Sequence, residues 1–499
     1  MLSTCMNRIF TFIACLIVTL SFGQPNPIAQ KYAATISESD LKENLTIIAS
    51  DAMEGRETGK RGQKMAAAFI AAYFDELNLK GPVAGSYYQP VPLFRTSAPV
   101  VTLKASTTEV SSESYVFYGS GHTNGEVSLP LVFAGKGSDS DLAKVDIRDK
   151  AVLIFFDGNA SITNNPILSN LLDKGAKRLL VAIEKTEDFT RISGLVKRFS
   201  GGRLGLENPK TEETTGSFIV SPDMAGKFFN TTNDKLIKAW ESKQLSKIKS
   251  TSIQYSIQQS VASVNSENIL GYLEGTDKKD EVVVVTAHYD HIGISTRAEG
   301  DKINNGADDD GSGTVAVLAM AKAFAQAKKE GNGPRRSILF MTVTGEEKGL
   351  LGSEYYSEHP VYPLDKTVVN LNIDMIGRRD PQHKGSAPYV YIIGSDRLSS
   401  ELHTLSEKTN KTYTNLAFDY LYNAEDHPDR IYYRSDHWNF AKKNVPIVFY
   451  FDGIHEDYHK PSDEVDKIEF DLLVLRAKNV FHLTWEIANR EARLMVDKK

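Results

Sequence analysis

From about residue 265 onward, short apolar segments alternate with longer segments of helical periodicity. Residues 281–288, EVVVVTAH, form a nearly continuous apolar run bounded by charge, which is typical of a strand buried on both faces. Residues 312–331 predict a helix, with Ser312 as its N-cap and Gly331 as its stop. Strands separated by helices predict an α/β fold, a mostly parallel, mixed sheet sandwiched by helices.

Further segments extend this pattern on both sides. Apolar strands are predicted at residues 337–345, 367–377, 389–394 and 446–453, and a long helix at residues 471–495. Upstream, residues 36–80 have helical spacing, whereas residues 112–250 contain short strands and polar loops. The sequence therefore predicts a smaller β-rich domain inserted into the α/β domain.

The net charge of the chain bears on its possible partners. The chain has 499 residues, which is enough for two or three domains, and its 58 basic and 64 acidic residues give a formal net charge of -6. This mild acidity gives no support to a nucleic-acid or membrane-surface partner.

The first 23 residues are typical of a signal peptide. Arg8 precedes the apolar run of residues 9–22, which is shorter than the roughly 20 residues that span a bilayer. We therefore expect cleavage and export to the periplasm, cell surface or medium, with a retained anchor as the alternative. Both cysteines, Cys5 and Cys15, lie in this segment. The mature chain would have no thiol and no membrane span, so His, Asp and Glu must hold any metal.

Acidic and imidazole side chains gather where the predicted strands end. Ligands of open α/β sheets bind at the carboxyl ends of the strands, and so many carboxylates there would repel one another without a dication. Each residue alone has an ordinary structural interpretation, such as capping by the aspartates before a helix. Together they favour a metal centre: His288, Asp290, Asp308, Asp309, Asp310, Glu346, Glu347, Asp374, His455 and His459.

The motifs AHYDH, GADDDGSG, TGEEKGLLGS, NLNIDMIG and YHKPSD, in this order, resemble the M28 family of dizinc peptidases, which are mainly exopeptidases. The resemblance covers the N-terminal helical segment and residues 265 to about 490, and implies a dizinc exopeptidase fold. The insert looks like a protease-associated (PA) domain. The expected division is a signal peptide (1–23), an N-terminal helical part (24–111), the PA-like insert (112–250) and the rest of the catalytic domain (251–499).

The resemblance implies two zinc ions and a role for each site residue. His288 and Asp374 would bind one ion, Glu347 and His459 the other, and Asp309 would bridge both. Asp290 would hold the tautomer of His288, and Tyr458 would polarise the reacting carbonyl. The supporting candidates are Ser435, Asp436 and His437. Of the three aspartates only Asp309 matches the family position, since Asp308 stands where an Asn is common, and Asp310 likewise. His291 and His455 match no ligand position and are expected to be structural.

Glu346 and Glu347 are adjacent, and neighbouring side chains on an extended backbone point in opposite directions. We therefore expect Glu347 to be the ligand and Glu346 to be the general base that takes a proton from the attacking water. The predicted function is an exported zinc aminopeptidase acting on peptides with a free N-terminus. Alternatives are a carboxypeptidase, kept open by Arg378 and Arg379, a one-zinc glutaminyl cyclase, a non-catalytic scaffold, and a mononuclear metal-binding protein.

Overall fold

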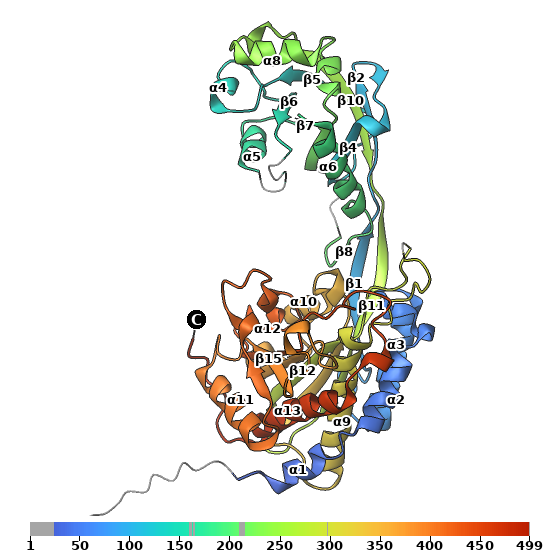
Figure 1. The fold of residues 1–499 in the computed structure, drawn as a ribbon, viewed down its shortest axis with the longest axis vertical. Helices are drawn as coiled ribbons and strands as arrows, with labels where there is room; N and C mark the ends of the chain where they lie inside the picture. The colour runs from blue at the N-terminus through green and yellow to red at the C-terminus, as the bar shows by residue number, and fades with distance from the viewer. Residues whose placement is uncertain (1–23, 159–161, 163–164, 209–214, 297, 499) are drawn as a thin grey trace, which may run out of the picture. The chain divides into compact units, whose positions relative to one another are not determined.

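The computed structural model describes residues 24–158, 162, 165–208, 215–296 and 298–498 (Figure 1). They form two compact units. The first contains the residues up to Tyr88, Ile269–Val343 and the residues from Tyr356 onward, and the second contains Gln89–Asn268 and Thr344–Tyr355. The predicted signal peptide lies outside the described residues. Within the described part, no helix combines the length and the apolar character needed to cross a bilayer.

The sheet of the first unit is mixed. Its strands run in the order β16, β15, β17, β14, β12, β13 and β11. Neighbours are parallel except β15 with β17 and β11 with β13. The strands are β11 (Val261–Leu273), β12 (Lys278–His288), β13 (Arg336–Val343), β14 (Thr367–Ile373), β15 (Tyr389–Ile393), β16 (Ala417–Asp419) and β17 (Ile447–Phe451). This arrangement confirms the predicted α/β fold class.

Helices cover both faces of this sheet. Helices α9 and α13 contact β12 and β13, whereas α12 contacts β14 and β17 (Figure 1). The helices are α1 (Pro27–Ala33), α2 (Glu38–Ile48), α3 (Arg61–Glu76), α9 (Gly313–Lys329), α10 (Leu351–Glu358), α11 (Ser400–Tyr413), α12 (His437–Ala441) and α13 (Phe470–Asn489).

Strand β12 is buried on both faces, as its apolar run predicts. Val283 and Val285 belong to the same apolar cluster as residues of α9 and α13. Val282 and Val284 point to the opposite side and belong to a cluster with residues of α12 and β17. All four are at most 2% exposed, because alternate side chains of a strand point to opposite faces.

The start of α9 differs from the sequence prediction. Ser312 makes no capping bond with its side chain. Its Oγ instead donates to the carbonyl of Asp308 at 2.8 Å, and the N–H of Gly313 donates to Asp310 Oδ1 at 2.9 Å. Ser312 therefore occupies the N-cap position, as predicted, but the side chain that caps the helix is that of Asp310, two residues before it. At the other end, Gly331 has φ +80° just beyond the last helical residues.

The second unit has its own sheet, in the order β3, β2, β10, β5, β6, β7, β9 and β4. These strands are β2 (Val100–Ala105), β3 (Thr108–Glu109), β4 (Tyr115–Ser120), β5 (Val127–Phe133), β6 (Ala151–Phe156), β7 (Arg178–Ile183), β9 (Thr215–Val220) and β10 (Thr251–Gln258). The helices are α4 (Asp139–Leu142), α5 (Pro166–Asp173), α6 (Thr186–Phe199), α7 (Met224–Phe228) and α8 (Asn233–Glu241). Strand β1 (Tyr88–Thr96) follows β11 in the order of the nine-stranded sheet and pairs antiparallel with β8 (Leu204–Gly205).

The second unit is wider than the predicted insert of residues 112–250. Strands β2, β3 and β10 lie outside that interval, yet they belong to the sheet, and β2 pairs with β10 along the whole length of β2. Beyond them, Ser97 N–H donates to the carbonyl of Ser260 at 2.9 Å, and Ser260 N–H donates to Ser97 Oγ at 3.0 Å. The two chain segments that enter and leave the sheet are therefore joined side by side.

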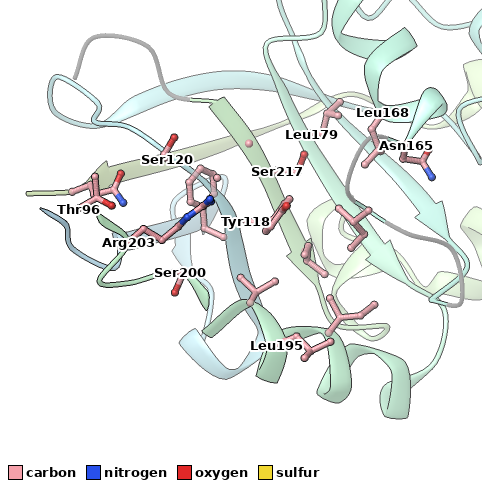
Figure 2. Close-up of a pocket in the computed structure, with 18 of the residues that line it drawn as sticks. Thr96, Tyr118, Ser120, Asn165, Leu168, Leu179, Leu195, Ser200, Arg203 and Ser217 are labelled. Carbon is pink, nitrogen blue, oxygen red and sulfur yellow. The ribbon is translucent and has the colours of Figure 1, made fainter. Parts of the chain in front are cut away.

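The second unit also contains a cavity of about 1060 Å³. Figure 2 shows apolar side chains such as Leu168, Leu179 and Leu195 in its lining, and polar ones such as Ser120 and Arg203. Its described lining contains none of the predicted metal ligands.

Candidate metal centre

The end of β12 brings the first predicted ligands together. His288 is the last residue of β12, and Asp374 directly follows β14, its parallel neighbour. His288 Nε2 lies 3.5 Å from Asp374 Oδ1, and the two residues are only 1% and 7% exposed. Parallel neighbours end at the same edge of the sheet, which is why residues far apart in sequence meet here.

Asp309 lies between two histidines. Its Oδ1 is 3.3 Å from His288 Nε2, and its Oδ2 is 3.1 Å from His459 Nε2. Burial alone would raise the pKa of Asp309, but the close contacts with the imidazoles of His288 and His459 hold that pKa well below its usual range. An ionised carboxylate that presents one oxygen to each side has the geometry of a bridging ligand.

These side chains fit a metal ion. One atom each from His288, Asp309 and Asp374 lie within 4.8 Å of one another, which is close enough for a shared ion. Imidazole nitrogen and carboxylate oxygen are suitable ligands for zinc, and all three residues are buried. A buried group of this kind calls for a compensating positive charge.

His288 is oriented by the backbone of Asp290. Its Nδ1 lies 3.0 Å from the Asp290 carbonyl oxygen and 3.9 Å from the Asp290 carboxylate. The carboxylate accepts a hydrogen bond from Thr58 Oγ1 at 2.6 Å instead. A proton on Nδ1 donated to the carbonyl leaves the Nε2 lone pair for a metal. The tautomer-setting role predicted for the Asp290 side chain is thus filled by its main chain.

A buried polar chain fixes Asp374. Ser435 Oγ donates to Asp374 Oδ2 at 2.6 Å and accepts from Asn372 Nδ2 at 2.9 Å. Thr286 Oγ1 donates to Asn372 Oδ1 at 2.6 Å and accepts from Asn370 Nδ2 at 2.9 Å. Ser435 was a supporting candidate, and the structure places it directly on a predicted ligand.

His437, another supporting candidate, turns away from the predicted ligands. Its Nε2 lies 2.7 Å from the carbonyl oxygen of Tyr432, and its ring stacks on Phe449. Burial lowers the pKa of His437 to about 3, so the ring is neutral in the fold. Asp436, between Ser435 and His437, is completely buried.

The segment that carries Asp309 is η4 (Ala307–Ser312), in which the Asp309–Asp310 peptide bond is cis. Asp310 accepts hydrogen bonds from the N–H groups of His288 at 3.2 Å, Gly313 at 2.9 Å and Met375 at 3.1 Å. Asp310 therefore connects the end of β12, the start of α9 and the segment after β14.

Arg56 is a functional candidate that sequence reasoning missed. It ends the short helix η1 (Asp51–Arg56) and is completely buried. Its guanidinium donates to the carbonyl oxygens of Ile48, Tyr289, Asn305 and Gly306 at 2.6 to 2.9 Å. Burial lowers the pKa of Arg56, while Asp309 and other carboxylates act to raise it. Arg56 thus holds the backbone on either side of the ligand-bearing loop.

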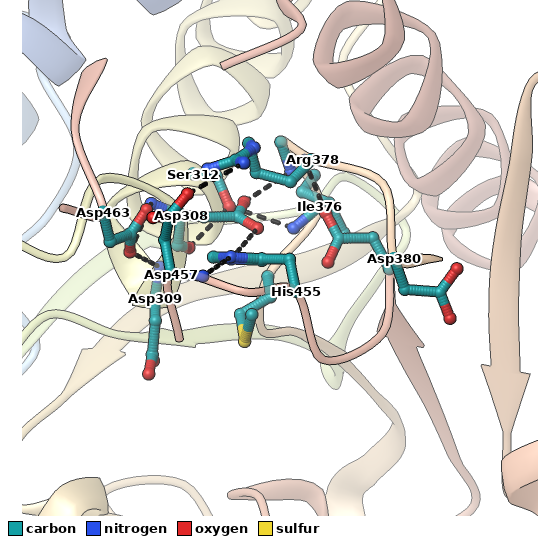
Figure 3. A network of polar contacts seen from close by, with 12 residues as sticks. Asp308, Asp309, Ser312, Ile376, Arg378, Asp380, His455, Asp457 and Asp463 are labelled. Carbon is teal, nitrogen blue, oxygen red and sulfur yellow. Dashed lines mark hydrogen bonds and ion pairs between the residues drawn. The ribbon is translucent and has the colours of Figure 1, made fainter. Parts of the chain in front are cut away.

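Two residues that follow β17, His455 and Asp463, contact Asp308, the neighbour of Asp309 (Figure 3). His455 Nε2 lies 3.2 Å from Asp308 Oδ2. Burial acts to lower the pKa of His455, but the contact with Asp308 raises it above the ordinary value. Burial acts to raise the pKa of Asp308, and the same contact lowers it.

The paired glutamates and Tyr458 complete the predicted set. Glu346 and Glu347 lie on η5 (Glu346–Lys348), which begins soon after β13, and both are partly buried. Their segment, Thr344–Tyr355, belongs to the second unit, where Asn268 Oδ1 accepts from Thr344 N–H at 3.1 Å. The roles of both glutamates stay predictions. The ring of Tyr458 stacks on His459, with ring centroids 3.9 Å apart.

The model of peptidase family M28 matches residues 268–484. The aminopeptidase YwaD of Bacillus subtilis (strain 168) is 28% identical over 242 residues, 47% of each chain. A probable leucine aminopeptidase of Arthroderma otae is 29% identical over 219 residues, 42% of this chain and 55% of the relative. The chain thus spans about half the length of the curated relatives it matches.

The fold is similar to that of a solved aminopeptidase from Aneurinibacillus sp. strain AM-1, with a TM-score of 0.54 at 18% identity over 94% of this chain and 98% of that one. The family match begins within β11 and ends within α13, so it contains His288, Asp309, Asp374 and His459. Residues 268–484 therefore belong to peptidase family M28.

Proposed function

We propose that the chain is a dizinc aminopeptidase that hydrolyses the N-terminal peptide bond of its substrates. The observation that carries this proposal is Asp309, which presents one carboxylate oxygen to His288 and the other to His459. The family match and the relatives named aminopeptidases support the reaction class.

In this proposal His288 and Asp374 hold one zinc ion, Glu347 and His459 hold the other, and Asp309 is shared. Bound metal ions of this kind supply an activated water and a positive field for the developing oxyanion. Glu346 accepts the proton of the attacking water and transfers it to the nitrogen of the leaving amine as the peptide C–N bond breaks. The carbonyl of Asp290 keeps His288 Nε2 unprotonated throughout.

The carboxypeptidase alternative needs a cationic group for the substrate's terminal carboxylate. Arg378 Nη2 donates to Asp457 Oδ2 at 3.1 Å, and Arg379 Nε donates to Glu469 Oε2 at 2.8 Å. Both arginines that kept this alternative open are thus paired with acidic side chains. An acidic centre favours the α-ammonium group of a free N-terminus instead.

The test compares matched peptides with free and N-acetylated N-termini. Acetylation removes the positive charge and the free lone pair of the α-amino group, so we expect hydrolysis of the acetylated peptide to be lost. Initial rates, with the products identified by mass spectrometry, decide the matter. Equal rates, or release of C-terminal residues from the acetylated peptide, would contradict the proposal.

We also propose that the chain is exported by a cleaved signal peptide. The support is Arg8 followed by the short apolar run of residues 9–22. Mass spectrometry of the protein from its native host should find a mature N-terminus near Gln24. A chain that retains residues 1–23 would contradict cleavage.

A further inference from the structure

We propose that Asp308 and His455 form a positioning pair for the metal centre proposed above, on which this inference rests. Neither residue is a predicted ligand. They are 0% and 3% exposed, and His455 Nε2 lies 3.2 Å from Asp308 Oδ2. The pair acts through the backbone segments that carry the ligands.

Asp308 touches two of these segments directly. It immediately precedes Asp309, the predicted bridging ligand, within η4. Its Oδ1 accepts the N–H of Gly377 at 2.6 Å, and Gly377 lies three residues after Asp374. A Cβ on Gly377 would lie 2.8 Å from Asp308 Oδ1, so the glycine permits this close approach. The side chain of Asp308 thus fixes the bridging segment against the segment of another ligand.

His455 brings in the third segment. The N–H of Asp457 donates to His455 Nδ1 at 3.2 Å, so Nδ1 acts as an acceptor. The ring proton is then on Nε2, the atom that forms the 3.2 Å contact with Asp308 Oδ2 (Figure 3). His455 lies four residues before His459, whose Nε2 faces Asp309. One carboxylate therefore links the segments of Asp309, Asp374 and His459.

The backbone of the bridging segment is held separately. The N–H groups of Asp308 and Asp309 both donate to the Asp463 carboxylate, at 3.1 Å. Loss of the His455 donor would leave the main chain anchored but would strand a buried oxygen of Asp308. A stranded buried acceptor is unfavourable, and the loop can relieve the cost by shifting, which moves Asp309 relative to His459.

The experiment compares His455→Leu with His455→Gln in the full chain. Leu removes the donor, whereas the side-chain amide of Gln can still donate from the position of Nε2. We expect His455→Leu to bind zinc about 10- to 100-fold more weakly than the parent, as for other groups that support metal ligands. His455→Gln should recover most of this loss. Zinc affinity is measured by competition with a chromophoric chelator, and the Co²⁺ absorption spectrum reports the ligand geometry.

Asp308→Asn provides a second variant if His455→Leu does not fold. In either orientation of the new side-chain amide, its NH₂ group faces another donor, the Gly377 N–H or the His455 Nε2–H. The same loss of zinc affinity is therefore expected. His482→Gln, a buried histidine on α13, is the control for the loss of a buried imidazole. Parent-like affinity and Co²⁺ spectrum in folded His455→Leu or Asp308→Asn would overturn the positioning pair alone. A parent chain that binds no zinc would overturn the proposed function together with the pair.

Discussion

At the scale of single residues, Asp309 and Glu346 are expected to fail in different ways when they are replaced. Asp309 faces histidines through both of its carboxylate oxygens. Asp309→Ala should therefore lower the occupancy of both metal positions together, because each loses the shared carboxylate. Metal content per chain, measured after removal of loosely bound ions, tests this. Full occupancy in the variant would mean that another aspartate is the bridge.

Glu346→Gln should have the opposite effect. Its side chain is predicted to move a proton and not to bind metal, so metal content should match the parent. The rate constant of hydrolysis should fall by about 10²- to 10⁴-fold, the usual contribution of a general base. Parallel measurement of turnover and metal content decides between the roles. Activity near that of the parent, or loss of metal, would refute the assignment of Glu346.

The sequence predicted His288, Asp309, Asp374 and His459 because each stands in a motif that resembles the M28 family. It could not predict Arg56, because this side chain contacts the backbone of Tyr289 and Gly306, which are 233 and 250 residues away in the chain. No local pattern contains that information. A buried arginine that binds only carbonyl oxygens leaves no charge partner to look for in the sequence.

At the scale of elements, patterns of burial were easier to predict than capping. The run in β12 has apolar residues on both faces, and this requirement is local to the strand. Ser312 is the N-cap residue of α9 as predicted, but its side chain does not cap the helix, because Asp310 is also close to the helix and accepts from Gly313 and from two other N–H donors. Which of several neighbouring acceptors binds the free N–H groups of a helix depends on the tertiary structure, so a local sequence pattern does not predict it.

The contact between α11 and α13 predicts a dependence of stability on pH. His482 of α13 stacks on Tyr413 of α11, with ring centroids 3.9 Å apart. Burial, with a smaller effect of Lys478, lowers the pKa of His482 to about 4. The unfolded chain then binds the proton more readily below about pH 6.5. The contribution of His482 to the free energy of unfolding is therefore complete above about pH 6.5. It is lost as the pH falls toward 4, and the loss is about 3 kcal/mol at most.

His482→Phe keeps an aromatic ring on Tyr413 but cannot titrate. We expect its free energy of unfolding, relative to the parent, to increase as the pH falls from about 7 to about 5. Urea unfolding at both pH values measures the difference. A constant difference between parent and variant would show that His482 is protonated equally in the folded and unfolded chains.

At the scale of the whole molecule, the boundary of the second unit was out of reach of the sequence. Strands β2 and β10 are neighbours in the sheet, but the other strands β3 to β9 lie between them in the sequence. Their pairing therefore depends on contacts between residues far apart in the chain. The short strands and polar loops that define the predicted insert, residues 112–250, lie between β2 and β10 in the sequence. The predicted insert is therefore narrower than the unit.

The hydrogen bonds between Ser97 and Ser260 define a deletion that tests whether residues 98–259 are needed for metal binding. Replacing residues 98–259 with a short glycine linker joins positions that are already neighbours. The shortened chain should keep the zinc content of the parent, because none of the predicted ligands is removed. Circular dichroism controls for folding. A folded, soluble deletion that has lost zinc would contradict the expectation that residues 98–259 are not needed to hold the metal.

The contacts of Arg56 also set an order of events during synthesis. Its guanidinium has acceptors on Asn305 and Gly306, so these bonds can form only after the ribosome has produced more than half of the chain. The intervening residues 89–268 can fold first, since domains generally fold as units from the N-terminus during synthesis. The bonds of Arg56 to this part of the chain must therefore wait until β12 and η4 have been synthesised. An arginine that holds a loop in the finished protein thereby makes the N-terminal helices one of the last parts to settle.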